Sequence, residues 1–353
     1  MSLCDVIDLV TPLAPGSGVK HVLVYLISGN PGLIEYYRLF FDCLLSILTK
    51  NNTDTMYHLH GSSLPGFELD HLAQQRTADS LGKAPPYSLN EIIDAVRTRV
   101  ESKTASLGLE LNLDTRSLPV ILVGHSVGSY IILEIISRWQ SKRPESAVHL
   151  IGGICLFPTV VDIAKSPSGR IAGPLALIPG FDVVVHMLSK LLLSWLSLAV
   201  VLPLVKAITR LPREAATITT AFLQSTYGVR QALYMAKDEL RQIEEDDWSD
   251  ELWGVQPGVG TDAIAADVSD VSQNPKLYFY WGVNDHWIAN ATRDAVIAAR
   301  AKTEKHGDQN RPVMELDDVG TPHGFCTTNH YSEHVAKKVA GYVLQLSQQD
   351  TRR

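Results

Sequence analysis

The stretch LPVILVGHSVGSYIILEIISRWQ, residues 118–140, decides the fold of this chain. It opens with an unbroken apolar run, which is typical of a strand buried on both faces of a sheet. GHSVG, residues 124–128, follows at once, and apolar residues at helical spacing continue from there. A serine at a tight turn from strand to helix is the setting of a nucleophile elbow, here with Ser126 at its apex. Gly124 and Gly128 are needed because a Cβ atom at either position would clash where the helix folds back over the strand.

The alternation of strand, loop and helix extends over much of the chain. Strands are predicted at residues 21–27, 54–60, 118–123, 149–156, 276–281 and 312–316, and helices at 34–48, 88–106 and 129–140. Apolar residues make up 45% and charged residues 20%, so the chain can bury a large core. Such alternation predicts an α/β fold, with a mostly parallel sheet flanked by helices.

One long insertion interrupts this pattern. Residues 158–272 contain no convincing strand, but an apolar stretch and a helical stretch at 214–245. We therefore predict a core formed by residues 1–157 and 273–353 and an inserted helical cap at 158–272.

A serine hydroxyl needs an adjacent base, which is itself oriented by an acid. Asp285 follows the strand at 276–281, and His323 follows the last predicted strand. Loops at the carboxyl ends of parallel strands are where α/β sheets form their sites. Because the chain order Ser, Asp, His is that of the α/β-hydrolases, we predict this fold and a catalytic triad of Ser126, Asp285 and His323.

Each partner has an alternative. Asp162 follows the strand at 149–156 and could replace Asp285 as the acid, and His330 could replace His323 as the base. His286 is predicted to line the site or to be exposed in its loop.

Acyl transfer also needs two backbone N–H groups directed at the developing oxyanion. We expect one from Val127, the residue after the nucleophile. The other is expected from Asn30, in the loop that closes the strand at 21–27, because Pro31 has no N–H. The alternative for this loop is a plain Asn-Pro-Gly turn.

Composition narrows the remaining classes of function. The net charge is −7 and no long run of Lys or Arg is present, so nucleic-acid binding is not predicted. The four cysteines lack a metal-type spacing, and His58 and His60 lack a third ligand, so neither a metal nor another cofactor is predicted. The N-terminus has no basic region typical of a signal peptide, and we expect the catalytic part in the cytosol.

An apolar segment dominates the insertion. Residues 183–205, VVVHMLSKLLLSWLSLAVVLPLV, contain one charge, that of Lys190. A single membrane span is excluded because the three triad residues come from both sides of the segment and have to meet on one side. On one continuous helix the polar and apolar side chains would occupy opposite arcs. The polar arc holds Asp182, His186, Ser189, Lys190, Ser194 and Ser197, and the apolar arc holds Val184, Leu188, Leu191, Trp195 and Leu202.

A helix lying in the plane of a lipid surface fits this pattern best. We place the lipid-surface segment at about residues 171–210. The alternatives are a lid helix packed on the core and a re-entrant hairpin that uses Gly180 and Pro203.

Five blocks of sequence resemble the lipid droplet-associated hydrolases, a branch of the serine α/β-hydrolases. The blocks are SGNPG (28–32) with Tyr36-Tyr37, GHSVGSY (124–130), LFPT (156–159) with SPSGRIA (166–172), YWG (280–282) with Asp285 and Trp287, and PHGF (322–325). The SPSGRIA block is the most specific because it carries no general hydrolase chemistry.

The resemblance implies the same triad, hydrolysis of lipid esters with sterol esters among the substrates, and attachment to lipid droplets and the endoplasmic reticulum with the catalytic domain facing the cytosol. Two positions depart from the hydrolase pattern. Ser28 stands where many hydrolases carry His before the oxyanion glycine, and His286 stands where a small residue or Pro follows the acid.

The leading hypothesis is therefore a serine esterase that acts on lipid esters. A lipid thioesterase or lysophospholipase would use the same triad, because acyl specificity depends on pocket shape. A droplet-associated structural protein with negligible activity is the hypothesis from a different class.

Overall fold

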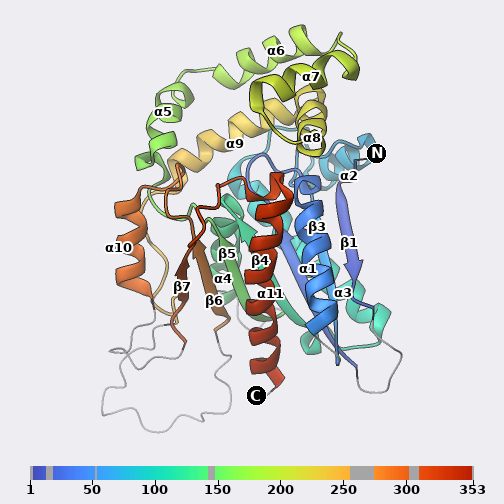
Figure 1. Cartoon of the computed structure of the whole chain (residues 1–353), viewed down its shortest axis with the longest axis vertical. Coiled ribbons are helices and arrows are strands. Elements are labelled where there is room, and N and C mark those ends of the chain that lie inside the picture. The colour runs from blue at the N-terminus through green and yellow to red at the C-terminus, as the bar shows by residue number, and fades with distance from the viewer. Residues whose placement is uncertain are drawn as a thin grey trace.

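A seven-stranded sheet with helices on both faces forms the centre of the computed structural model (Figure 1). The structure describes residues 3–12, 19–51, 54–141, 148–254, 274–301 and 310–351. The strands are β1 (Val6–Val10), β2 (Lys20–Ile27), β3 (Thr55–Ser62), β4 (Pro119–His125), β5 (His149–Leu156), β6 (Lys276–Trp281) and β7 (Val313–Leu316). Their order is β1-β3-β2-β4-β5-β6-β7; β1 is antiparallel to β3, and the other pairs are parallel. The predicted α/β fold with a mostly parallel sheet is confirmed.

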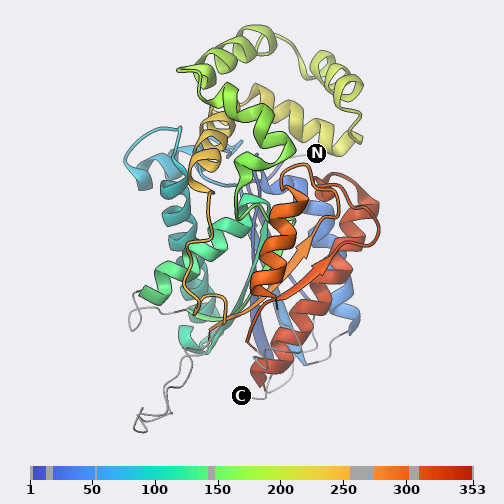
Figure 2. The same cartoon turned by 90° about the vertical axis from the view of Figure 1, so that its left-hand side faces the viewer.

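Strand side chains alternate between two apolar layers, as the two-residue period of a strand requires. In β2, Leu23, Tyr25 and Ile27 belong to one layer, and Val22 and Val24 to the other. The first layer includes α3 (Leu89–Leu111), α4 (Val127–Ser141) and α10 (Asn290–Arg300), and the second includes α1 (Arg38–Asn51) and α11 (Asn329–Thr351) (Figure 2). Burial on both faces explains why these strands are continuous apolar runs.

Local signals account for most of these elements, but not for β1. At the start of α3, Ser88 Oγ accepts from the Glu91 N–H and the Glu91 carboxylate accepts from the Ser88 N–H, and this capping box explains why the helix begins there. The strand β1 is not among the predicted strands. It is short, Asp8 interrupts its apolar residues, and Val6 and Val10 are exposed at the edge of the sheet.

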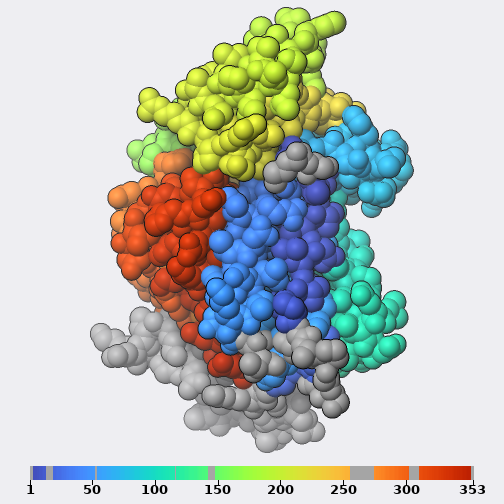
Figure 3. Space-filling view, turned by 45° about the vertical axis from the view of Figure 1, so that its right-hand side comes forward, coloured from blue at the N-terminus to red at the C-terminus, as the bar shows by residue number. Residues whose placement is uncertain are grey.

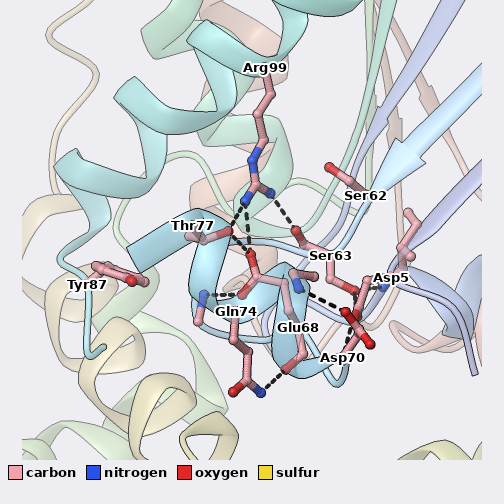
Figure 4. A network of polar contacts seen from close by, with 12 residues as sticks. Asp5, Ser62, Ser63, Glu68, Asp70, Gln74, Thr77, Tyr87 and Arg99 are labelled. Carbon is pink, nitrogen blue, oxygen red and sulfur yellow. Dashed lines mark hydrogen bonds and ion pairs between the residues drawn. The ribbon is translucent and has the colours of Figure 1, made fainter. Parts of the chain in front are cut away.

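A polar network holds the loop that follows β3 (Figure 4). Arg99 of α3 donates to the buried Glu68 at 2.9 Å. Asp5 accepts two backbone N–H groups of the same loop, each at 2.8 Å. The Leu64 N–H then donates to the Gly32 carbonyl at 2.8 Å, so this network also supports the loop that follows β2.

In the described part of the segment between β5 and β6, five α-helices lie over the carboxyl ends of the strands, and we call them the cap (Figures 1 and 2). They are α5 (Pro167–Ala176), α6 (Phe181–Leu193), α7 (Leu198–Thr209), α8 (Arg213–Gln224) and α9 (Gly228–Gln242). The predicted end of the insertion, residue 272, lies outside the described residues. The cap forms the upper end of the molecule in the space-filling view (Figure 3).

The apolar segment at 183–205 is two helices, so the expectation of one continuous helix is wrong. At the end of α6 the Lys190 carbonyl accepts from both the N–H and the Oγ of Ser194. The side-chain amide of Gln224 donates to the carbonyls of Leu193 and Leu196 at 3.0 and 2.8 Å, which satisfies acceptors freed by the break. Leu202 consequently does not continue the apolar arc of α6 and is half-buried against α8.

Candidate active site

The turn between β4 and α4 holds Ser126 in a left-handed backbone conformation, with φ of +56°. The Ser126 N–H donates to the Leu156 carbonyl at 2.9 Å. A Cβ atom on Gly124 would lie 2.5 Å from the Gly128 carbonyl oxygen, and one on Gly128 would clash with the Ile27 carbonyl oxygen. The local geometry is that of a nucleophile elbow, and it explains the requirement for both glycines.

The loops after β4, β6 and β7 bring Ser126, Asp285 and His323 together. His323 Nε2 lies 2.9 Å from Ser126 Oγ, and His323 Nδ1 lies 2.6 Å from Asp285 Oδ2. Burial opposes the charge of Asp285, which is 6% exposed, but the hydrogen bonds from His323 and the Trp287 N–H keep the pKa of this carboxyl below its usual range. Asp285 is therefore a carboxylate at neutral pH and can orient the His323 ring.

The alternative acid and base lie elsewhere. Asp162 forms an ion pair with Lys165 at 2.8 Å. His330 is exposed at the start of α11, where its ring contacts Tyr331. Neither residue is brought to Ser126.

The loop after β2 lies against the nucleophile. A Cβ atom on Gly29 would be 3.0 Å from Ser126 Cβ, so a side chain there would force Ser126 or the loop to shift by a few tenths of an ångström. The Gly29 N–H donates to the Tyr37 hydroxyl at 3.0 Å. The Asn30 side chain points to the cap, where its Nδ2 donates to Glu239 Oε1 at 2.8 Å and to the Ala232 carbonyl at 3.0 Å.

His125 connects this loop to the histidine loop. The His323 carbonyl can only accept, so His125 Nε2 carries a proton and donates to it at 2.9 Å. In the neutral ring Nδ1 is then an acceptor, and the Tyr37 hydroxyl, which itself accepts from the Gly29 N–H, donates to it at 2.6 Å. Burial lowers the pKa of His125 to about 3, so the ring stays neutral at physiological pH. One directed chain of hydrogen bonds thus joins Gly29, Tyr37, His125 and His323.

A second contact joins the cap to the acid loop. Ser168 of α5 lies in the SPSGRIA block, and its Oγ is 2.7 Å from His286 Nδ1. The Ser168 N–H also donates to the His286 carbonyl at 2.9 Å. The ring of His286 lies 5.8 Å from that of His323, centroid to centroid, so His286 borders the site while remaining exposed.

The two strand histidines have separate partners. His58 Nε2 lies 3.0 Å from His21 Nδ1, whereas His60 Nδ1 lies 3.6 Å from Asp8. Where the structure describes the chain, Asp317, Asp318 and His334 come close enough together to share an ion. Asp317 already accepts three hydrogen bonds, from Tyr280 Oη and from the N–H and Oγ1 of Thr321. Such a satisfied carboxylate does not by itself indicate a metal site.

The cap exposes large apolar side chains on α5, α6, α7 and their connections. In α6, Val184, Leu188 and Leu191 are exposed, and Trp195 in the following connection is 85% exposed. The exposed set also includes Ile171, Leu175, Leu177, Ile178, Met187, Leu192, Leu198, Leu204 and Ile208. The alternative of α6 as a lid helix buried on the core does not describe this arrangement.

By length and composition, no single described helix could cross a membrane. The pair α5 and α6 passes the same test together, with a bend of 91° between the two helices, close to Gly180.

Sequence reasoning assigned no role to His125, Tyr37 or Glu239. His125 belongs to the elbow sequence and Tyr37 to one of the family blocks, and neither pattern indicates a further role for the residue. Glu239 lies among charged residues of an amphipathic helix, and no local signal distinguishes a buried carboxyl there.

A mostly parallel sheet that presents a serine elbow, a histidine and a carboxylate at its strand ends defines an α/β-hydrolase. The sequence model of the lipid-droplet associated hydrolase family matches residues 20–326. The chain belongs to this family, as its blocks of sequence predict, and it is a hydrolase.

Named relatives share most of their length with the chain. The lipid droplet-associated hydrolase of Gallus gallus is 26% identical over 284 residues, which cover 79% of this chain and 74% of the relative. That of Homo sapiens is 24% identical over 319 residues, covering 90% and 83%. A soluble variant of monoglyceride lipase from Saccharomyces cerevisiae, solved with a substrate analog, has a similar fold, with a TM-score of 0.50, 13% identity and coverage of 97% and 92%.

Proposed function

We propose that this protein is a serine hydrolase that cleaves carboxylic esters of lipids at the surface of lipid droplets. The observation that carries the proposal is the pair of contacts from His323, at 2.9 Å to Ser126 Oγ and at 2.6 Å to Asp285. A buried serine in a strained turn, in contact with a histidine that a carboxylate orients, is suited to acyl transfer.

In the proposed reaction Ser126 Oγ attacks the ester carbonyl while His323 Nε2 takes its proton. Asp285 stabilises the imidazolium that results. The N–H groups of Val127 and Asn30 bind the oxyanion; on its loop Asn30 is the suitable donor, because the Gly29 N–H is already engaged by Tyr37. The alcohol leaves with the proton from His323, and water then hydrolyses the acyl enzyme.

The lipid part of the proposal rests on the cap and on the names of the relatives. Apolar side chains that cover the outer faces of α5, α6 and α7 mark a lipid or protein contact surface. The relatives are named for lipid droplets. We propose that this surface contacts a droplet or the endoplasmic reticulum membrane, with the catalytic core on the cytosolic side, and that the segment at about 171–210 forms the contact. Sterol esters and other neutral lipid esters are the substrates to test first.

A fluorophosphonate probe tests the serine chemistry directly. Wild type should be labelled at Ser126, and Ser126→Ala should lose both labelling and turnover of p-nitrophenyl butyrate, by about a thousandfold or more. A folded Ser126→Ala protein with near-wild-type turnover would remove the serine-hydrolase proposal. Absence of labelling in folded wild type would favour a structural protein. Comparison of turnover on cholesteryl oleate, an acyl thioester and a lysophospholipid would then separate esterase from thioesterase and lysophospholipase.

A further inference from the structure

A carboxyl group of the cap binds the loop that carries Asn30. Glu239 is buried and belongs to α9, which lies on the side of the cap that faces the core (Figure 1). Asn30 Nδ2 donates to Glu239 Oε1 at 2.8 Å and to the Ala232 carbonyl, also on α9, at 3.0 Å. Both protons of the amide nitrogen are used, so α9 holds the Asn30 side chain at two points.

The direction of these hydrogen bonds is determined by their partners. A backbone carbonyl can only accept, so the nitrogen of the Asn30 amide, and not its oxygen, faces α9. Glu239 Oε1 therefore accepts from Asn30 whether the carboxyl is charged or neutral. On the other side of the loop Tyr37 binds the N–H of Gly29, the neighbouring residue. The core thus binds the N–H of Gly29 and the cap binds the side chain of Asn30, so the peptide that joins these two residues is held at both ends.

Packing alone does not explain a carboxyl at position 239. Among the described side chains, no Lys or Arg forms an ion pair with Glu239. Burial raises the pKa of Glu239 to about 7, although the bond from Asn30 lowers it and the nearby Asp238 raises it further. An apolar residue of similar size would avoid the cost of burying this group. Its burial together with its hydrogen bond to the Asn30 side chain indicates a role in the proposed site.

We propose that Glu239 is a positioning residue that directs the backbone N–H of Asn30 at the oxyanion by holding the Asn30 side chain. This inference rests on the proposed function, in which that N–H binds the oxyanion. It means that the cap completes a site whose reacting groups all belong to the core. A protein whose α9 is displaced would keep the triad and lose one correctly directed oxyanion donor.

The test compares variants on both sides of the contact. Glu239→Leu removes the acceptor, and Asn30→Ala removes the donor but keeps the backbone N–H. Each should lower kcat on p-nitrophenyl butyrate on the order of 10- to 100-fold and leave KM within about threefold, because the N–H acts on the transition state. The double variant should lose no more than the larger single loss, since both break one contact. Glu239→Gln keeps an acceptor and should stay within about threefold of wild type.

Arg230→Gln is the matched control on α9. Arg230 pairs with Asp182 inside the cap at 3.5 Å and does not contact the Asn30 loop, so its loss should leave kcat unchanged. Rates are expressed per active site counted with a fluorophosphonate, which removes the effect of unfolded protein. If Glu239→Leu does not fold, Asn30→Ala and Glu239→Gln decide the result.

Two outcomes would overturn the inference. In one, Glu239→Leu and Asn30→Ala both turn over at the wild-type rate per active site. In the other, Glu239→Gln loses as much as Glu239→Leu, so the acceptor is not what matters. If Ser126→Ala is inactive in the same assay, either result contradicts only the proposed role of Glu239, and the proposed function stands. If Ser126→Ala is active, the proposed function itself fails.

Discussion

The helices α4 and α6 are both rich in apolar residues, but these side chains are buried in α4 and largely exposed in α6. In α4 of the core, Ile131, Ile132 and Leu133 are fully buried in one of the two apolar layers. In α6 of the cap no residue is buried, and Leu188 and Leu191 are exposed. Hydrophobic burial therefore stabilises α4 throughout, whereas α6 has no fully buried residue and packs through partly buried ones such as Leu193.

Polar contacts attach α6 instead. Ser189 Oγ donates to the Leu223 carbonyl at 3.2 Å, and Lys190 Nζ donates to the Gln224 carbonyl at 2.9 Å. Of the polar arc, the four residues on α6 are thus half-buried in the cap, namely Asp182, His186, Ser189 and Lys190, whereas Leu188 and Leu191 of the apolar arc face outward. Such a helix is suited to contact with a second apolar phase, and the comparison with α4 separates residues needed for folding from residues needed for surface contact.

The largest expected effect lies in the core, at the acid. Asp285→Asn should lower kcat by about 10⁴-fold, because an amide favours the wrong tautomer of His323 and cannot stabilise the imidazolium. Asp162→Asn is the control: Asp162 is paired with Lys165, and the change should leave kcat within about twofold. Turnover of p-nitrophenyl butyrate measures both. The reverse pattern would move the acid to the loop after β5.

The next effect belongs to the cap. Replacing Leu188, Leu191 and Trp195 together with Asp should weaken binding to triolein droplets coated with phosphatidylcholine on the order of a thousandfold. Full burial of each apolar side chain is worth about 1.5 to 3 kcal/mol, and even partial insertion of three adds up to such a factor. Flotation of the droplets measures binding. Turnover of a water-soluble ester should stay within about threefold, because none of the three residues contacts the triad.

Leu133→Asp tests the other half of the comparison. Leu133 is fully buried in α4, so one charge there should unfold the protein, whereas three charges in the cap should leave its melting temperature nearly unchanged. A triple cap variant that unfolds would show that α6 is a packed lid. A folded triple variant that still floats with droplets would exclude this segment as the principal contact.

The sequence alone predicts those parts of the candidate site that depend on neighbouring residues or on the succession of strands and helices along the chain. The elbow at Ser126 follows from a strand, two glycines and a helix, all within one short segment. The positions of Asp285 and His323 follow from the rule that parallel strands present their carboxyl ends at one edge. These features require no knowledge of which helices pack together.

The remaining features depend on contacts between distant segments. Tyr37 and His125 are 88 positions apart, and Asn30 and Glu239 are 209 apart, so no periodicity connects them. The break between α6 and α7 was missed for a related reason. The carbonyls freed by the break accept hydrogen bonds from Gln224 on α8. The spacing of apolar residues within the segment itself does not indicate this partner.

The contact between core and cap should make stability depend on pH. The pKa of Glu239 rises from its usual 4.5 to about 7 in the folded protein, which corresponds to about 3 kcal/mol. This stabilisation is fully present below about pH 4.5 and is lost as the pH rises through about 7, because the unfolded carboxyl ionises first. Glu239→Gln does not titrate. Its advantage over wild type in urea unfolding should therefore grow from near zero at about pH 4 to about 3 kcal/mol at about pH 8. A difference that is constant over this range would contradict a buried, ionisable Glu239.

The smallest effect concerns the chain of hydrogen bonds inside the core. Tyr37→Phe removes the hydroxyl that joins the Gly29 N–H to His125, so the oxyanion loop and the His323 loop lose their link and kcat should fall about tenfold. Tyr36→Phe is the matched control, because its hydroxyl contacts Thr219 of the cap at 2.7 Å and lies outside this chain of bonds. Active-site titration followed by turnover separates a lower rate from a lower fraction of folded protein. Equal losses in the two variants would mean that the contact between Tyr36 and the cap matters as much for kcat as the link between Tyr37 and His125. The rate would then not distinguish contacts within the core from contacts with the cap.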